Sequence, residues 1–321
     1  MKKLIIVLHN AISSGSLDEV DVLAQRDLVK TACLKLGYQV ECMSSAEDPM
    51  KVARDIHLRD PDMVFNLVEA LWGKGELIYV QAAVLNSLGI PFTGVSLEAL
   101  FLTTNKLLTK NILRSNNILT ADYFTLDQVA DLNSRKRYII KPIWEEGSLG
   151  FINNPVFTWK NMDMIAWINS FSKRHYFIEE YIEGREINVS LLAGKNGPEI
   201  LPIAEIIFSD YFKDKDKILG YKAKWLVDSD EYQETKRAFG RLDSDPELEK
   251  KIRDLSLKIW DLFGLTGYAR IDFRINKKCE PYILEVNGNP CISPDSGFVA
   301  SVEEAGYSQK TMIERIINDA R

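Results

Sequence analysis

The stretch GYARIDFRINKKCEPYILEVNGNPCISPDS, residues 267–296, decides the fold that we predict for this chain. In its first half, charged and apolar residues alternate with a period of two, which is typical of a β-strand with two different faces. A polar turn at residues 276–280 separates it from a second apolar segment. The stretch therefore predicts two strands that form a β-hairpin.

One face of this hairpin would carry four polar side chains, those of Arg270, Asp272, Glu285 and Asn287. Leu284 and Val286 would point to the other face. Two carboxylates and an amide oxygen are hard ligands of the kind that Mg²⁺ prefers, and an adjacent arginine suits the stabilisation of developing negative charge. Alternating charge is equally typical of an ordinary hairpin with one solvated face.

Length and composition limit the class of protein. The chain has 321 residues, which is enough for two or three domains, and its 46% hydrophobic and 27% charged residues are ordinary for a globular protein. A net charge of −6 argues against a general surface for nucleic acid or anionic membranes.

Cysteine usage and apolar run lengths predict the compartment. The four cysteines show no CxxC spacing, and only three histidines are present, which disfavours structural zinc and a disulfide framework. The first apolar run, residues 4–8, is too short for the core of a signal peptide, and no window approaches a membrane span. We therefore expect a cytoplasmic protein that binds neither membranes nor nucleic acid.

Residues 1–95 alternate between strand and helix patterns. Apolar strands at 4–8 and 63–67 and helical segments at 18–36 and 76–88 give a βαβ rhythm, which predicts a parallel sheet with right-handed crossovers. The segment after the first strand reads HNAISSGS and lacks GxGxxG, so a nicotinamide-binding site loses its main support.

The middle of the chain carries candidate phosphate ligands. A helix predicted at 97–117 has Lys106 and Lys110 one turn apart, a spacing that usually forms a solvated face. A strand at 137–142 contains Lys141 near its end, and a loop with Gly147 and Ser148 follows. Glycine lets backbone N–H groups approach an anion that the lysine neutralises, although a surface hairpin turn is the alternative. The loop does not match the GxxxxGK[ST] pattern.

Two later segments suggest nucleotide contacts and a lid. In 176–192 an acidic bend at Glu183 joins two apolar strands, and it could accept hydrogen bonds from adenine and ribose or be a charged hairpin turn. Residues 208–233 are polar and long for a loop, and loops of this length are often functional lids. Lys224 and Trp225 within it favour a lid. Helices are predicted at 246–263 and near 308–320.

Taken in order, the segments LGIPFTG, TTNKLLTK, IIKP, EEGSLG, FIEEYIEGREI, GYKAKW, GYARIDF and YILEVNGNP resemble the ATP-grasp superfamily, and within it the D-alanine–D-alanine ligase-like branch. The resemblance extends from about residue 65 to 307. It implies an α/β protein with an N-terminal Rossmann-like parallel-sheet domain at 1–96. An ATP-grasp fold of two α+β subdomains would follow, the central one at 97–183 and the C-terminal one at 184–321.

The resemblance implies ATP and Mg²⁺ as cofactors, with Mn²⁺ as an alternative to Mg²⁺. The metal ligands would be Asp272, Glu285 and Asn287. The residues that contact ATP would be Lys106, Lys141, Gly147, Ser148, Glu179, Tyr181, Ile182, Glu186 and Lys224. The catalytic residues would be Arg270, Lys224 and Ser148. The family phosphorylates a carboxylate with ATP, and an amine then attacks the acyl phosphate. The implied partners are small carboxylate and amine substrates and a second copy of the chain in a homodimer.

The chain departs from the family at the substrate side. Its segments HNAISSGS and FNLVEALWG replace the family's GGxSxE and HG motifs, and Trp225 replaces a lid tyrosine. Cys291 replaces a glycine at the oxyanion position, and Asp295 precedes Ser296 where the family holds a D-alanine carboxylate. We therefore expect Cys291, Asp295, Ser296 and Trp225 to contact a substrate, and the added carboxylate of Asp295 suggests a positively charged one.

These departures predict a carboxylate–amine ligase for substrates other than two D-alanines. Three alternatives stay open at this point: a genuine D-alanine–D-alanine ligase, an ATP-grasp kinase that phosphorylates a small molecule, and a non-catalytic nucleotide-binding module. The last would be expected to lose the metal ligands or the phosphate-binding lysines, and the chain keeps both sets.

Overall fold

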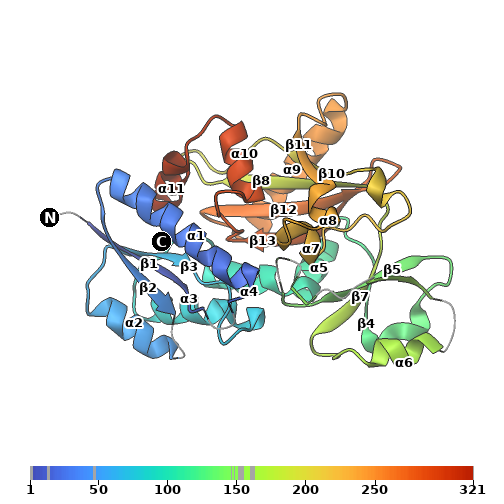
Figure 1. The fold of residues 1–321 in the computed structure, drawn as a ribbon, viewed down its shortest axis with the longest axis horizontal. Coiled ribbons are helices and arrows are strands. Elements are labelled where there is room, and N and C mark those ends of the chain that lie inside the picture. Colours follow the sequence, from blue (N-terminus) through green and yellow to red (C-terminus); the bar gives the residue numbers. More distant parts are fainter. Residues whose placement is uncertain are drawn as a thin grey trace.

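A computed structural model describes residues 3–12, 15–45, 48–145, 147, 149–150, 155–159 and 163–320. The described residues form a mixed α/β fold with three separate sheets, one in each third of the molecule (Figure 1). This arrangement matches the predicted N-terminal parallel-sheet domain followed by two α+β subdomains. The exact boundaries between the three units stay a prediction.

The N-terminal unit contains the predicted parallel sheet. Its strands pair in the order β2-β1-β3, all parallel. Strand β1 is fully buried along residues 5–8, which explains its continuous apolar sequence. The elements of this unit are β1 (Leu4–Asn10), α1 (Leu17–Lys35), β2 (Gln39–Ser45), α2 (Pro49–His57), β3 (Met63–Leu67), η1 (Gly75–Leu77) and α3 (Ile78–Ser87).

The central unit is a small antiparallel sheet with strand order β4-β7-β5-β6. It has a hydrophobic core of its own, which includes Tyr138, Ile140 and Ile178. Its elements are β4 (Tyr123–Thr125), η2 (Leu126–Asp131), β5 (Arg137–Pro142), β6 (Val156–Thr158), α6 (Asp163–Asn169) and β7 (Tyr176–Glu180).

Two helices, and not the single helix predicted at 97–117, connect the N-terminal and central units. Helix α4 (Leu97–Thr104) ends at Asn105, whose backbone is extended, and α5 (Lys106–Ser115) begins immediately afterwards. The Asn105 side chain accepts hydrogen bonds from the backbone N–H groups of Leu107 at 3.1 Å and Leu108 at 3.0 Å. Asparagine is a favoured N-cap, so its side chain starts a second helix where an unbroken one was expected.

The C-terminal unit is a larger antiparallel sheet with strand order β11-β10-β8-β12-β13, and β9 pairs with β8. Strands β7 and β8 lie in different sheets, so the bend at Glu183 is a crossing between subdomains and not a hairpin turn. The predicted lid contains three short helices. The elements are β8 (Arg185–Leu192), β9 (Glu199–Ile200), β10 (Ala204–Phe208), η3 (Asp210–Phe212), α7 (Tyr221–Trp225), α8 (Asp230–Gln233), β11 (Thr235–Phe239), α9 (Pro246–Leu262), β12 (Tyr268–Ile275), β13 (Pro281–Gly288), α10 (Gly297–Glu304) and α11 (Gln309–Asn318).

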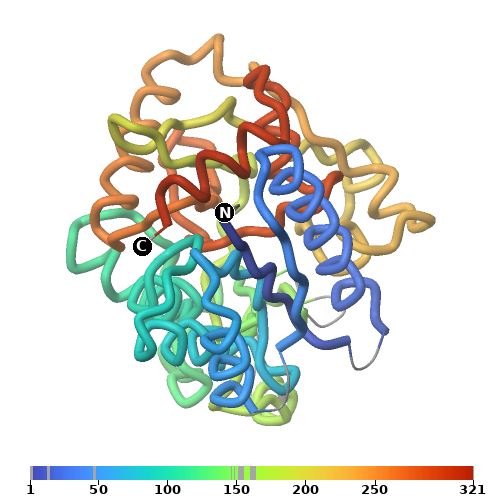
Figure 2. Tube along the Cα trace, turned by 90° about the vertical axis from the view of Figure 1, so that its left-hand side faces the viewer, coloured from blue at the N-terminus to red at the C-terminus, as the bar shows by residue number. Residues whose placement is uncertain are grey.

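The two ends of the chain pack together. Helix α1 runs beside α11, and both views show the C-terminal helices against the N-terminal unit (Figures 1 and 2). One hydrophobic core contains Val29 of α1, Phe65 of β3, Phe298 of α10 and Ile313 of α11. This shared core holds α1 next to the start of α10, two segments that carry predicted or candidate substrate residues. Among the described residues, no helix is both long and apolar enough to cross a membrane.

Candidate active site

The predicted hairpin is present and brings its four polar residues to one face. Strands β12 and β13 pair antiparallel, with Arg270 opposite Asn287 and Asp272 opposite Glu285. The register then shifts, because Phe273 pairs with Ile283. Leu284 is the residue that this bulge leaves unpaired, and it lines the cavity instead of facing away as the strict alternation predicted.

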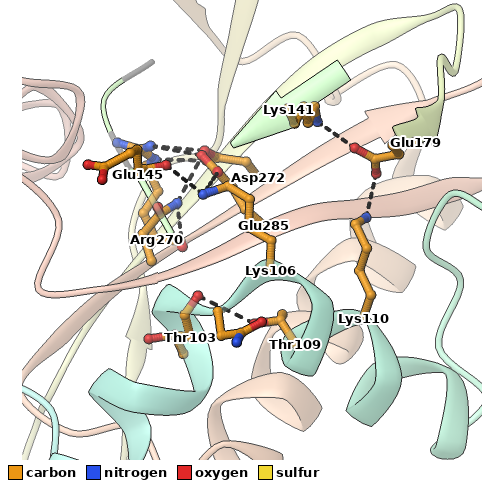
Figure 3. Close-up of polar contacts among 12 residues, drawn as sticks. Thr103, Lys106, Thr109, Lys110, Lys141, Glu145, Glu179, Arg270, Asp272 and Glu285 are labelled. Carbon is orange, nitrogen blue, oxygen red and sulfur yellow. Dashed lines mark hydrogen bonds and ion pairs between the residues drawn. The ribbon is translucent and has the colours of Figure 1, made fainter. Parts of the chain in front are cut away.

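Asp272 is held by three side chains at the centre of this face. The guanidinium of Arg270 donates to both carboxylate oxygens, with distances of 2.8 Å from Nε and 2.9 Å from Nη2. Asn188 of the neighbouring strand β8 donates to Oδ1 at 2.8 Å, and Asn287 donates to Oδ2 at 3.3 Å. Bidentate arginine–carboxylate pairs are strong and geometrically specific, so Arg270 and Asp272 fix one another (Figure 3).

Glu285 is surrounded by cations. Lys106 Nζ lies 3.7 Å from Oε2, and Arg270 Nη2 lies 4.0 Å from Oε1. Burial acts to raise the pKa of Glu285, but Lys106, Lys224 and Arg270 outweigh it and hold that pKa well below its usual range. Burial raises the pKa of Asp272 to about 6, and the charge of Glu285 adds to this shift against the effect of Arg270.

The donor set of the hairpin fits a magnesium ion. Asp272 and Glu285 face one another across the strand pair, and the amide of Asn287 contacts Asp272. Burial and the charge of Glu285 both raise the pKa of Asp272, and a divalent cation between the two carboxylates would oppose both effects. In the present arrangement Arg270 occupies both oxygens of Asp272, so at least one oxygen has to be released for a metal to bind.

A second ion cluster lies behind the predicted nucleotide site and joins two lysines through one glutamate. Glu179 of β7 pairs with Lys110 of α5 and, at 2.6 Å, with Lys141 of β5 (Figure 3). Lys110 and Glu179 are each 1% exposed, and Lys110 also donates to Thr120 at 2.8 Å. The expected solvated face of Lys106 and Lys110 was therefore wrong, since both lysines are buried. The lysines hold the pKa of Glu179 below its usual value, although burial acts to raise it.

The residues predicted to contact adenine and ribose line the same cavity as the hairpin. These cavity residues are Lys141, Glu179, Tyr181, Ile182 and Glu186. The ring of Tyr181 lies between the guanidinium groups of Arg137, 5.0 Å from the ring centre, and Arg274, 5.9 Å from it. Arg274 also pairs with Glu186 at 3.2 Å. Their roles in nucleotide binding stay predictions.

Helix α7 carries Lys224 into the site and is attached at both ends. Trp225 Nε1 donates to the carbonyl oxygen of Gly147 in the predicted phosphate loop at 3.0 Å. Tyr221 donates its hydroxyl to Asp18 of α1 at 2.9 Å. Burial lowers the pKa of Lys224, against the opposing effect of Glu285. Ser148 lies outside the described residues.

The substrate end of the cavity is built from residues far apart in sequence. Cys291 Sγ donates to Asp21 of α1 at 3.1 Å and contacts Ser293 Oγ at 3.1 Å. Ser293 in turn donates to Asp295 at 3.1 Å. Burial raises the pKa of Cys291 well above its usual value, so its thiol is a neutral donor. The side chain of Ser296 caps α10 by accepting from Val299 N at 3.2 Å.

Two further acidic residues stand at this end, and sequence reasoning did not identify them. Gln25 donates to Glu69 at 2.8 Å and to Asp21 at 3.3 Å, and it accepts from the backbone N–H of Ile292 at 3.1 Å. Burial raises the pKa of Asp21, and it raises the pKa of Glu69 to about 7, with Asp21 adding to the latter shift. No arginine or lysine of the described residues forms an ion pair with either carboxylate.

The described residues among the predicted metal, nucleotide and substrate ligands, together with Asp21 and Glu69, line one cavity of about 1950 Å³ between the three units. A typical ligand pocket measures roughly 300–1,000 Å³, so this one has room for a nucleotide and further substrates. Its walls contain the hairpin face, α7, the start of α1 and the segment before α10. One cavity thus unites the predicted ATP and substrate residues.

Comparison with known proteins identifies the family. The family model described as D-ala D-ala ligase C-terminus matches residues 125–318. The D-alanine–D-alanine ligase of Aquifex aeolicus is 30% identical over 300 residues, which cover 90% of this chain and 92% of the relative. An uncharacterized protein y4sG of Sinorhizobium fredii is 29% identical over 266 residues, 82% of this chain and 75% of that protein. The chain therefore belongs to the D-alanine–D-alanine ligase family of ATP-grasp enzymes, whose members are ADP-forming carbon–nitrogen ligases.

Solved structures show the same fold. A D-alanine–D-alanine ligase from Bacillus anthracis, complexed with ATP, superposes with a TM-score of 0.74 at 22% identity, covering 99% of this chain and 97% of that one. The VanG D-Ala:D-Ser ligase from Enterococcus faecalis gives a TM-score of 0.72 at 16% identity, covering 99% of each chain. The predicted ATP-grasp architecture is confirmed.

Proposed function

We propose that this protein is a carboxylate–amine ligase that uses ATP to form a peptide-like bond between two substrates, at least one of which carries a positive charge. The reaction would pass through an acyl phosphate and release ADP and phosphate. The observation that carries the proposal is the contrast between the two ends of one cavity. The hairpin end pairs its carboxylates with cations, whereas the substrate end holds Asp21 and Glu69 with neutral partners only.

The nucleotide end supplies the parts that phosphoryl transfer needs. Asp272, Glu285 and Asn287 would hold Mg²⁺ or Mn²⁺, and a bound metal neutralises phosphate charge and orients the phosphates for in-line attack. Lys106 and Lys141 line the side of the cavity formed by the central unit, where they can neutralise phosphate oxygens. Lys224 would approach the transferred phosphate from the lid, and Arg270 would stabilise the charge that develops when the amine attacks.

The substrate end favours a cationic group on the basis of charge. A carboxylate with a raised pKa gains when a cation enters, because the cation stabilises the charged form; Asp21 is half-buried and Glu69 is exposed at the cavity wall. Asp21 and Glu69 share the amide of Gln25, which holds both at fixed positions. Alanine can offer this pair one cation, its α-ammonium group, whereas a substrate with a cationic side chain can offer a cation to each carboxylate, so the arrangement supports a substrate other than D-alanine.

A genuine D-alanine–D-alanine ligase is the second candidate, supported by the 30% identity to the Aquifex aeolicus enzyme over most of both chains. The departures at Trp225 and Cys291 argue against it, since the indole contacts Gly147 and the thiol contacts Asp21. An ATP-grasp kinase is the third candidate, and it would phosphorylate one substrate without consuming an amine.

The deciding experiment measures phosphate release from Mg²⁺-ATP with D- and L-amino acids, singly and in pairs, including lysine, ornithine and arginine. Mass spectrometry then identifies the product of each active combination. A product equal to two substrates minus water, with one of them cationic, is expected. Turnover with D-alanine alone would support the second candidate, and a phosphorylated single substrate would support the kinase.

A further inference from the structure

Arg237 of β11 lines the cavity, and the proposed function assigns it no role. Register places it on the cavity face of the sheet: Arg237 pairs with Ile206, Ile206 pairs with Glu186, and Glu186 pairs with Arg274. Paired residues of neighbouring strands share a face, and Glu186 and Arg274 line the same cavity. The arginine therefore points to the site from the far edge of the sheet.

The guanidinium of Arg237 rests on the first residue of helix α10. A Cβ added at Gly297 would meet Arg237 Nη2 at 3.2 Å, Nε at 3.5 Å and Cζ at 3.6 Å. Nη2 and Nε are nearer than Cζ, so the edge of the guanidinium that carries these two nitrogens faces the place where a side chain at position 297 would begin. Gly297 follows Asp295 and Ser296, so Arg237 belongs to the substrate end of the cavity.

Arg237 is exposed to solvent at the cavity wall, and in the described part of the chain it makes neither an ion pair nor a hydrogen bond. Two positive features lie near it: the N-terminal end of α10 and the guanidinium of Arg270. Burial, and then the charge of Arg270, lower the pKa of Arg237, while Tyr232 and Asp295 oppose the shift. The carboxylate of Asp295 already accepts a hydrogen bond from Ser293. An anionic group at this point would relieve the repulsion.

We propose that Arg237 is a specificity-determining residue that binds a carboxylate of the amine substrate. A guanidinium presents two parallel N–H groups that match a carboxylate, and this geometry gives both strength and selectivity. The phosphates of ATP are the other anions in the reaction, but the lysines predicted to bind them belong to the central unit and the lid. Arg237 instead lies beside Gly297, the residue that follows Ser296. The assignment rests on the proposed function, because it needs an amine substrate.

The test compares an amine substrate with its carboxamide, which keeps the amine and the shape but loses the negative charge. With any amino acid found to be consumed as the amine, the wild-type enzyme should prefer the acid to its amide. Arg237→Gln should lower kcat/KM for the acid on the order of 10- to 100-fold, since a hydrogen-bonded charge is lost, and leave kcat/KM for the amide unchanged. The KM for ATP should stay the same.

Two variants control for a simple structural effect. Gly297→Ala keeps the arginine and requires its nearest guanidinium nitrogen to shift by only a few tenths of an ångström, so it should lower the preference for the acid much less than Arg237→Gln does. Arg241→Gln removes an arginine that follows β11 and does not line the cavity, and it should preserve the preference. Arg237→Lys keeps the positive charge but loses the planar guanidinium, so it should retain part of the preference for the acid.

An equal loss for the acid and the amide would show that Arg237 acts only on the fold, and would overturn the assignment. A raised KM for ATP with unchanged preference would identify a phosphate as the ligand instead. Failure of the wild-type enzyme to consume any amine would overturn the proposed function itself, an outcome distinct from an active ligase whose preference for the acid does not depend on Arg237.

Discussion

The buried ion cluster of Lys110, Glu179 and Lys141 gives a prediction whose size follows from the structure. Lys110 and Glu179 are each 1% exposed, so neither charge can turn to water when its partner is removed. Removal of one partner of a buried ion pair typically costs about 3–5 kcal/mol, whereas replacement of both by apolar groups is often close to neutral. Glu179→Leu should therefore destabilise the protein by about 3–5 kcal/mol, because it leaves two lysines without their shared carboxylate.

The double variant separates charge from packing. Lys110→Met alone should cost somewhat less, since Glu179 keeps Lys141 at 2.6 Å. Lys110→Met with Glu179→Leu should recover most of the loss, because only Lys141 then remains and its side chain is 14% exposed. Urea unfolding of the four proteins gives the coupling energy between the two positions, which we expect to be on the order of 3 kcal/mol.

An exposed neighbour supplies the control. Lys136 pairs with Glu180, the next residue of β7, but the two side chains are 40% and 21% exposed. Lys136→Met should change the unfolding free energy by no more than about 1 kcal/mol, as for other solvent-accessible pairs. Additive losses in the double variant of the buried pair, or a loss at Lys136 as large as at Glu179, would refute the reasoning from burial.

Four further predictions concern the cavity. Glu285→Ala should abolish Mg²⁺-dependent phosphate release, measured across a range of MgCl₂ concentrations, and near-normal turnover would mean that the hairpin is only structural. Lys224→Ala should leave ATP binding, measured by calorimetry, unchanged but lower kcat sharply. An unchanged rate would mean that the lid takes no part in the mechanism. Tyr221→Phe should lower kcat about tenfold through loss of one charge-assisted hydrogen bond to Asp18, with Asp18→Asn giving a non-additive effect in a double-mutant cycle. Affinity for a cationic substrate should rise as pH increases through about 7, where Glu69 ionises. Glu69→Gln should weaken binding and flatten this rise. The same pH dependence in the variant would exclude Glu69 as the group that binds the cation.

Much of the fold and of the metal face could be predicted from sequence because the information there is local. Alternation within the hairpin places Asp272 and Glu285 on one face without knowledge of any other segment, and the pairing of these two residues confirms this placement. The order of the motifs then identified the ATP-grasp family and with it the three sheets. The bulge at Leu284 was missed, since a register shift leaves no signature in the alternation of a single strand.

Other features could not be predicted because they depend on contacts between distant segments. Lys110 has the spacing of a surface lysine, and only the approach of β7, with Glu179, makes it a buried residue. Cys291 meets Asp21 across 270 positions of sequence. Asn105 was the one local signal that was overlooked: asparagine before a lysine-rich helical segment is a typical N-cap, and it explains the break between α4 and α5.

The distribution of charge supports the proposal that one cavity keeps the family's chemistry and accepts a different substrate. At the hairpin, Arg270 and Lys106 neutralise Asp272 and Glu285, so a metal and phosphates of opposite charge can enter by exchanging partners with them. At the other end, the side-chain donors to Asp21 and Glu69 within the described part of the chain are the neutral Cys291 and Gln25, and no described lysine or arginine pairs with either carboxylate. Asp21 is half-buried and Glu69 is exposed, and a substrate that brings its own cation would stabilise the charged form of each. Under the proposed function, the first end would select for nucleotide and metal and the second would select among substrates, so that substitutions at the second would change specificity without disturbing phosphoryl transfer.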